Sequence, residues 1–205
     1  MKTLILDMYG VIMKDPTANL LNFINNFFPK VTFEDIYPLW KEADTGKLTS
    51  LDFLKEIGFE KNTAEIEKMY LNTLEIDEEF YFMAQELKED YNLVLLSNDL
   101  SDWSTYIRNK YDISKYFNLI AVSGDIGIRK PDPRIFKFVL EKSDQFHEEC
   151  YFVDDRRSNL YAAEKLGINS ILFNRRNVEY QGKTVYNFRE LTELMKLISV
   201  GKSFS

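Results

Sequence analysis

Four short stretches of this sequence carry side chains that could do chemistry, and each lies where an apolar run ends or a turn is made rigid. In chain order they are Asp7, Ser97-Asn98, Lys130 and Asp154-Asp155. Asp7 directly follows the apolar residues 4–6, and Lys130 lies in a turn that Pro131 and Pro133 make rigid. Carboxylates, a cation, a hydroxyl and an amide together suit the binding and transfer of an anionic group.

The acidic residues are the most informative of these groups. A pair of carboxylates at the end of a buried strand is costly unless a cation or hydrogen-bond donors meet it. Oxygen ligands from two strand ends suit Mg²⁺, which prefers carboxylates, waters and a substrate phosphate. Lys130, Ser97 and the metal would then share the charge of a transferring phosphoryl group, and Asp7 would be free to attack phosphorus. The residues therefore predict phosphoryl transfer.

The elements that must position these groups alternate between strand and helix. Apolar runs predict strands at residues 3–7, 92–96, 119–123, 150–153 and 170–173, and helices at residues 78–91, 101–111, 133–141, 158–166 and 188–198. This alternation predicts an α/β fold, namely a Rossmann-like parallel sheet with helices on both faces. Ligands of such sheets bind beyond the carboxyl ends of the strands, so we expect the four stretches to meet there.

A second region interrupts this pattern after the first strand. Apolar residues recur at three- and four-residue steps, which predicts helices near residues 20–28, 33–43, 50–58 and 63–74. We therefore expect an inserted helical-bundle cap over residues 15–83. Residues 1–14 and 84–205 would form the Rossmann-like core.

Composition limits the partners. The 205 residues include 26 basic and 33 acidic side chains, and the net charge of −7 gives no general attraction for nucleic acid or an anionic membrane. The single cysteine, Cys150, cannot form an internal disulfide and is expected to be a buried strand residue. Met1-Lys2 runs straight into the first strand, so we expect a cytoplasmic protein. Monomer and homodimer both stay open.

The four stretches resemble, in this order, the motifs of the haloacid dehalogenase superfamily, in the subgroup whose helical cap follows the first strand. The matching segments are Asp7-Met8-Tyr9-Gly10-Val11-Ile12, Leu96-Ser97-Asn98, Arg129-Lys130-Pro131-Asp132-Pro133 and Phe152-Val153-Asp154-Asp155-Arg156-Arg157-Ser158-Asn159. The resemblance covers nearly the whole chain. Four matches in the family's order are far more specific than any one of them.

The resemblance implies a phosphatase that forms a covalent aspartyl-phosphate on a small phosphorylated metabolite. Asp7 would be the nucleophile, Ser97 and Asn98 would hold the phosphoryl oxygens, and Lys130 would offset the charge on both. Mg²⁺ would be bound by Asp7, the main-chain carbonyl of Tyr9 and Asp155, with Asp154 in support. In the cap, the turn at residues 44–47 and the preceding Trp40 and Lys41 would be candidates for substrate contact.

One position departs from the family pattern. Phosphatases of this family commonly carry a second Asp two residues after the nucleophile, as acid for the leaving alcohol and base for the attacking water. This chain has Tyr9 there. A phenol with an ordinary pKa of ~10 can donate a proton but is a poor base at neutral pH. Some sugar-phosphate phosphatases of the subgroup also lack the second Asp, and an anomeric phosphate needs less acid assistance because it leaves more readily.

Two alternatives stay open at this point. 2-Haloacid dehalogenases carry Asp-x-Tyr-Gly in their first motif, but they use no metal and need an arginine in the cap region. No arginine occurs between Met1 and Trp103, and the Asp154-Asp155 pair would repel a haloacid anion. The other alternative is a catalytically weak sensor that binds a phosphorylated ligand. The retained carboxylate of Asp7 argues against it, because a pure binder has no use for a nucleophile.

Overall fold

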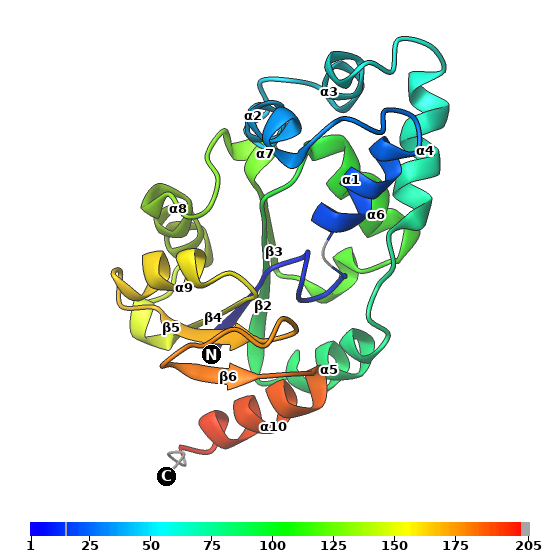
Figure 1. Ribbon diagram of the computed structural model, residues 1–205. Helices are drawn as coiled ribbons and strands as arrows, with labels where there is room; N and C mark the ends of the chain where they lie inside the picture. The colour runs from blue at the N-terminus through cyan, green and yellow to red at the C-terminus, as the bar shows by residue number, and fades with distance from the viewer. Residues whose placement is uncertain (15, 202–205) are drawn as a thin grey trace.

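Six parallel strands lie at the centre of the protein, whose computed structural model describes residues 1–14 and 16–201 (Figure 1). The strands are β1 (Lys2–Leu6), β2 (Tyr91–Ser97), β3 (Leu119–Val122), β4 (Cys150–Asp154), β5 (Asn169–Phe173) and β6 (Lys183–Val185). Their order across the sheet is β3-β2-β1-β4-β5-β6, which is the Rossmann order. The predicted Rossmann-like parallel sheet is confirmed. The chain adds β2 and β3 on one side of β1 and then crosses to the other side, where β4, β5 and β6 follow.

Side chains of β1 are buried on both faces of the sheet. Leu4 and Leu6 belong to one hydrophobic cluster and Ile5 belongs to the other. Successive side chains of a strand point to opposite faces, so the alternation follows directly from the extended backbone. A continuous apolar run was therefore the right signal for a central strand.

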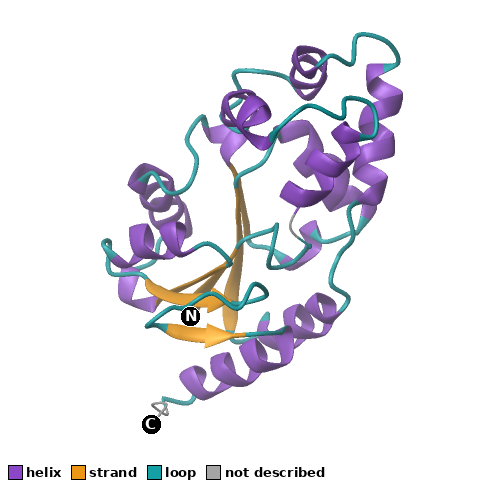
Figure 2. Ribbon diagram, in the orientation of Figure 1, coloured by secondary structure: helices purple, strands orange, loops and turns teal. Residues whose placement is uncertain are grey.

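Helices cover both faces of this sheet (Figure 2). On one face lie α8 (Pro133–Ser143) and α9 (Arg157–Glu164), where the ring of Phe136 packs 5.2 Å from that of Phe152 in β4. On the other face lie α5 (Glu79–Leu87), α6 (Ser101–Lys110) and α10 (Phe188–Ser199). The layers are those that a two-faced parallel sheet requires.

Four helices follow β1 and lie together beyond the carboxyl ends of the strands (Figure 1). They are α1 (Pro16–Asn25), α2 (Phe33–Ala43), α3 (Ser50–Ile57) and α4 (Thr63–Thr73). The Thr32 side chain accepts a hydrogen bond from the backbone N–H of Asp35, and the backbone N–H of Thr32 donates to the Asp35 carboxylate, so α2 begins as its sequence predicts.

The turn after α2 lies very close to the core. A Cβ atom on Gly46 would lie 2.4 Å from the carbonyl oxygen of Gly124 in the short helix α7 (Ser123–Ile126), and Gly46 has φ +70°. Both the backbone angle and the space therefore require glycine at residue 46. This contact brings α2 directly over the edge of the sheet.

Several elements differ from the sequence prediction. The helix predicted over residues 78–91 ends at Leu87, and Tyr91 already opens β2. The strand β6, the helix α7 and two short 3-10 helices (Ser114–Tyr116 and His147–Glu149) were not predicted, because three or four residues show no periodicity. The expected boundary at residue 83 lies inside α5, which packs against α10. The division into core and cap stays a prediction.

Two simpler predictions can be compared with the structure. Cys150 is fully buried with a free thiol, as expected. Across residues 1–14 and 16–201, no helix combines the length and the apolar character that crossing a membrane requires.

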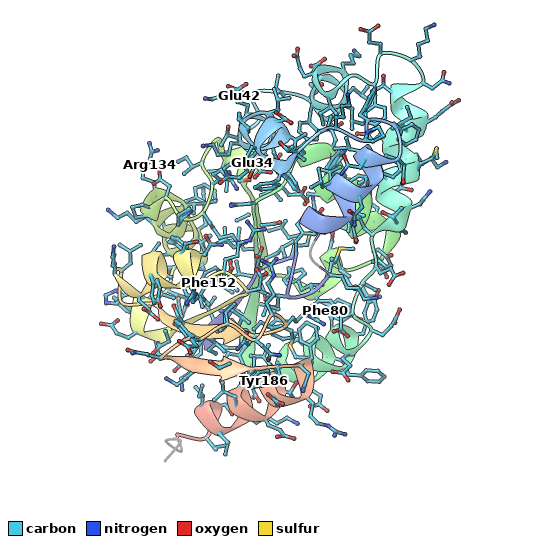
Figure 3. The ribbon with its side chains drawn as sticks, viewed as in Figure 1. Glu34, Glu42, Phe80, Arg134, Phe152 and Tyr186 are labelled. Carbon is cyan, nitrogen blue, oxygen red and sulfur yellow. The ribbon has the colours of Figure 1, made fainter. Side chains whose placement is uncertain are left out.

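The packing of α5 yields a stability prediction. Phe80, labelled in Figure 3, is fully buried. Its ring packs against those of Tyr116, Phe117 and Phe188. Phe80→Ala is expected to lower the free energy of unfolding by about 3–5 kcal/mol, because it leaves a cavity. Urea denaturation measures this change. The matched control is Phe82→Ala, since Phe82 lies on the same helix but is 75% exposed. A change in its free energy of unfolding beyond about 1 kcal/mol would contradict the assignment of the buried and exposed faces of α5.

Candidate active site

The ammonium group of Lys130 lies at the centre of the site. Its Nζ lies 2.7 Å from Oδ1 of Asp7 and donates to Oδ2 of Asp154 at 2.9 Å and to the carbonyl oxygen of Leu96 at 2.8 Å. Both ends of the Asn98 amide bond the main chain of Lys130, at 2.8 and 2.9 Å. The side chain is 2% exposed, so its cation is fixed between two carboxylates. All four predicted stretches thus meet at one buried lysine.

The fourth predicted group, the acid pair, completes a cluster with the nucleophile candidate. Asp7, Asp154 and Asp155 each offer a carboxylate oxygen, and these oxygens lie within 4.8 Å of one another. Asp7 follows β1 and Asp154 ends β4, so adjacent strands of the sheet bring together residues that lie far apart in the sequence.

The two acids of the pair have different surroundings. The Asp154 carboxylate accepts bonds from Lys130, from the Asn159 amide at 2.9 Å and from the backbone N–H of Arg156 at 2.7 Å. Oδ2 of Asp155 lies 3.1 Å from Nη2 of Arg176 and Oδ1 lies 3.9 Å from Nε of Arg156, but the buried Oδ1 accepts no hydrogen bond within the described chain. Asp154 is therefore held by hydrogen bonds, whereas Asp155 keeps one carboxylate oxygen that can accept a further ligand.

The residues present fit a divalent cation. A Cβ on Gly10 would lie 2.5 Å from Cγ of Asp155, so the turn after β1 closes over this carboxylate and only glycine leaves it room. The three carboxylates are buried, whereas Arg156 and Arg176, which pair with Asp155, are partly exposed. A cluster of buried carboxylate oxygens suits a hard cation. When bound, Mg²⁺ would supply positive charge next to phosphoryl oxygens. Asp7, Asp155 and the carbonyl oxygen of Tyr9 stay the predicted ligands.

Burial shifts the proton affinities of these groups. Burial raises the pKa of Asp7 well above its usual range, against the attraction of Lys130, and the neighbouring Asp154 and Asp155 raise it further. Burial and Asp154 raise the pKa of Asp155 to about 6. Burial lowers the pKa of Lys130, but the carboxylates of Asp154 and Asp7 outweigh it and raise the pKa above its ordinary value. The lysine therefore stays charged.

Tyr9 does not offer its hydroxyl to the reacting centre in this structure. The hydroxyl donates to Oδ2 of Asp99 at 3.0 Å, and burial and Asp99 raise its pKa well above 10. Burial also raises the pKa of Asp99, which is 2% exposed. The pairing of Tyr9 with Asp99 was not predicted, because the two residues lie far apart in the sequence. The catalytic role of Tyr9 stays a prediction.

Ser97 is the last residue of β2 and is fully buried. Its Oγ has no hydrogen-bond partner among residues 1–14 and 16–201, although the adjacent Asn98 lines the cavity described next. An unpaired hydroxyl at a strand end is consistent with a ligand in that place, and phosphate binding by Ser97 and Asn98 stays a prediction.

A cavity of about 400 Å³ opens above Asp7 and Lys130. Its other wall comes from α2 and the turn after it, through Phe33, Tyr37, Trp40, Lys41 and Asp44. The side chain of Asp44 is almost fully buried and its Oδ2 lies 3.1 Å from Nη2 of Arg129, which precedes Lys130. This ion pair joins α2 to the core directly beside the site.

Two arginines were missed as residues of the cavity. Arg129 and Arg156 both line it, although no arginine occurs in the first part of the chain. Their only sequence signal was their position next to Lys130 and Asp155. The absence of arginine from residues 1–103 therefore does not keep arginines out of the cavity, because later segments of the chain supply them.

The structural role of Arg175 was not predicted from the sequence either. Its guanidinium donates to the carbonyl oxygens of Gly10 at 3.2 Å and Val11 at 3.0 Å and pairs with Asp77. The backbone N–H of Asp77 also bonds the carbonyl of Ile12 at 2.9 Å. One side chain after β5 therefore ties the segment that leaves the core after β1 to the segment that returns to it.

The parallel sheet and the cluster of buried acids around a lysine define an α/β protein with a candidate hydrolytic site at the carboxyl ends of its strands. A family model described as haloacid dehalogenase-like hydrolase matches residues 1–167. The chain belongs to the haloacid dehalogenase-like hydrolases.

Two curated relatives are similar to this chain. It is 30% identical to drimenol cyclase from Aspergillus calidoustus over 68% of its own length and 28% of the cyclase. It is 26% identical to D-ribitol-5-phosphate phosphatase from Bacteroides thetaiotaomicron over 64% of its own length and 69% of the phosphatase. The chain thus spans little more than a quarter of the first relative and about two thirds of the second.

Solved structures share the fold. A haloacid dehalogenase family enzyme from Bacteroides thetaiotaomicron superposes with a TM-score of 0.74 at 24% identity, over 84% of this chain and 93% of that one. A structure of that enzyme with magnesium and inorganic phosphate gives 0.71 at 23% identity, over 88% and 98%. L-2-Haloacid dehalogenase from Xanthobacter autotrophicus gives 0.71 at 15% identity, over 96% and 98%.

The buried Asp44 yields a pH prediction. Burial raises its pKa from 3.8 to about 6, against the opposing charges of Arg129, Arg156 and Lys130 and a hydrogen bond from Trp40. The folded state therefore binds this proton more tightly than the unfolded state, so the contribution of Asp44 to stability rises as the pH falls through about 6.

The comparison is between wild type and Asp44→Asn in a chelating buffer. From about pH 7.5 to about pH 4.5, the free energy of unfolding of wild type is expected to rise by about 2 kcal/mol relative to that of Asp44→Asn. Urea denaturation across this range measures the difference. Glu42→Gln, an exposed position on the same helix (Figure 3), should follow wild type. Parallel curves for wild type and Asp44→Asn would show that Asp44 titrates normally.

Proposed function

We propose that this protein is a Mg²⁺-dependent phosphatase that hydrolyses a small phosphorylated metabolite through an aspartyl-phosphate on Asp7. The observation that carries the proposal is the buried ammonium of Lys130, held between Asp7 and Asp154 beside an Asp155 oxygen that accepts no hydrogen bond within the described chain. The similarity to the ribitol phosphate phosphatase supports the same reaction type.

The first step requires an ionised carboxylate at Asp7. One oxygen of Asp7 attacks phosphorus, the bond from phosphorus to the leaving oxygen breaks, and the leaving group takes a proton from solvent. Lys130 favours the ionised form of Asp7 through a 2.7 Å contact, and its fixed position requires no reorganisation when charge develops. Asn98 keeps the lysine loop in place.

The second step is hydrolysis of the aspartyl-phosphate by water, which restores Asp7 and releases inorganic phosphate. The hydroxyl of Tyr9 is bound to Asp99 and does not provide a base. Water must therefore attack without a base from Tyr9. The same hydroxyl gives no proton to the leaving oxygen in the first step, so a leaving group that departs readily, such as an anomeric sugar oxygen, fits this site.

A 2-haloacid dehalogenase is the second candidate. The fold is shared with a dehalogenase, and Arg129 and Arg156 line the cavity where a substrate carboxylate would bind. The three buried acids disfavour it, because without a cation they would repel an anionic substrate.

Removal of the nucleophile tests the reaction. Asp7→Asn is expected to lower the turnover of p-nitrophenyl phosphate at least roughly a thousandfold, because no covalent intermediate can form. Release of inorganic phosphate measures this, and the melting temperature checks the fold. Unchanged turnover in the variant would remove Asp7 from the mechanism. Halide release from 2-chloropropionate in the presence of EDTA would instead identify a dehalogenase. Binding of phosphate without turnover of any ester would identify a sensor.

Binding of the metal can be measured separately from activity. At a Mg²⁺ concentration about a hundred times Kd, the melting temperature of wild type is expected to rise by roughly 5–10 °C, because the metal binds only the folded state. Asp155→Asn should lose most of this rise. The exposed Glu34→Gln should keep it. Equal shifts in wild type and Asp155→Asn would mean that Asp155 is not a ligand.

A further inference from the structure

Helix α2 carries apolar side chains on two different sides. One side is buried among the neighbouring helices through Ile36 and Ala43. The other side carries Phe33, Tyr37 and Trp40, which are spaced four and three residues apart and so lie along one face of the helix. These three residues, the aromatic face of α2, line the same cavity as the nucleophile candidate.

The aromatic face of α2 is not fully covered by the protein. Tyr37 is 38% exposed, and Phe33 and Trp40 are half-buried. Apolar surface that stays open inside a cavity, with polar groups at its edge, is typical of a ligand site. Because the cavity floor holds Asp7 and Lys130, a phosphate ester bound there places its leaving group toward α2.

Neighbouring cations hold the aromatic face in position. Nζ of Lys41 lies 5.2 Å and Cζ of Arg129 lies 5.9 Å from the centre of the Tyr37 ring. Asp44 in turn fixes the guanidinium of Arg129. The rings of Phe33 and Tyr37 lie 5.1 Å apart and are tilted by 30°. The face is therefore ordered before a ligand arrives, and charged groups lie at its edge.

We propose that the aromatic face of α2 binds the flat side of a sugar ring in the leaving group, so that the substrates are phosphate esters of cyclic sugars. This inference rests on the proposed phosphatase function. A sugar ring presents C–H groups on its flat side, which pack on aromatic rings, and hydroxyls at its rim, which can bond Lys41, Arg129 and Asp44. An open-chain polyol has the same groups but no flat side to pack.

The test compares a ring with an open chain of the same carbon number. Wild type is expected to hydrolyse glucose 6-phosphate with a kcat/KM roughly tenfold above that for sorbitol 6-phosphate. Trp40→Ala should bring this ratio close to one, while Trp40→Phe, which keeps an aromatic ring, should retain most of it. Phe82→Ala is the control, since Phe82 lies on α5 and outside this cavity, and should keep the wild-type ratio.

A second variant covers the case in which Trp40→Ala does not fold. Tyr37→Ala removes a more exposed ring and should also lower the ratio. A ratio near one in wild type, or a wild-type ratio in folded Trp40→Ala or Tyr37→Ala, would overturn the inference. Cyclohexyl phosphate distinguishes the ring types: if it reacts as well as glucose 6-phosphate, the assignment to sugars is wrong.

Binding separates this inference from the proposed function. The same esters are titrated by calorimetry into Asp7→Asn with Mg²⁺ present. A ring preference in binding, with no ester hydrolysed by wild type, would overturn the phosphatase proposal and support the aromatic face as a sugar site. Hydrolysis of all esters with no preference for the ring would support the phosphatase proposal and overturn the assignment of the aromatic face as a sugar site.

Discussion

The contact of the Lys130 ammonium with Asp7 and Asp154 is the interaction on which the rest of the site depends. Three carboxylates from two neighbouring strands lie in a buried place, where like charges without compensation would be strongly unfavourable. Lys130 offsets part of this charge, Arg156 and Arg176 pair with Asp155 from a more exposed position, and Oδ1 of Asp155 still accepts no hydrogen bond within the described residues. The buried carboxylate oxygens therefore suit a cation, and the cations around them suit an anion such as phosphate.

The sheet order determines which residues can take part in this contact. β1 lies between β2 and β4, so residues at the carboxyl ends of these three strands become neighbours. The turn after β1 then closes over Asp155 at Gly10, and Arg175 holds that turn through the carbonyls of Gly10 and Val11. The same arginine pairs with Asp77, where the chain comes back from α4. The position of Asp7 and the path of the chain into the helices are therefore coupled.

In the proposed function, different parts of the chain supply the reacting groups and the wall that selects the substrate. The groups proposed for phosphoryl transfer follow strands of the core, whereas the wall opposite them comes from α2. The ion pair between Asp44 and Arg129 and the contact of Gly46 with Gly124 hold this wall in place. The hydroxyl of Tyr9 is bonded to Asp99 and donates no proton into the cavity. Under the proposed function, this arrangement suits a leaving group that needs little acid assistance.

The sequence by itself determined the α/β class, most of the elements and the four stretches that carry the candidate site. Apolar runs and helical spacing are local signals, and the catalytic residue types stand directly after them. Only the tertiary structure decided the roles of Arg129, Arg175 and Asp99 and the pairing of β6, since these depend on contacts between residues far apart in the chain. A long-range ion pair or a three-residue edge strand has no local pattern, because its free energy comes from a partner that only folding brings near.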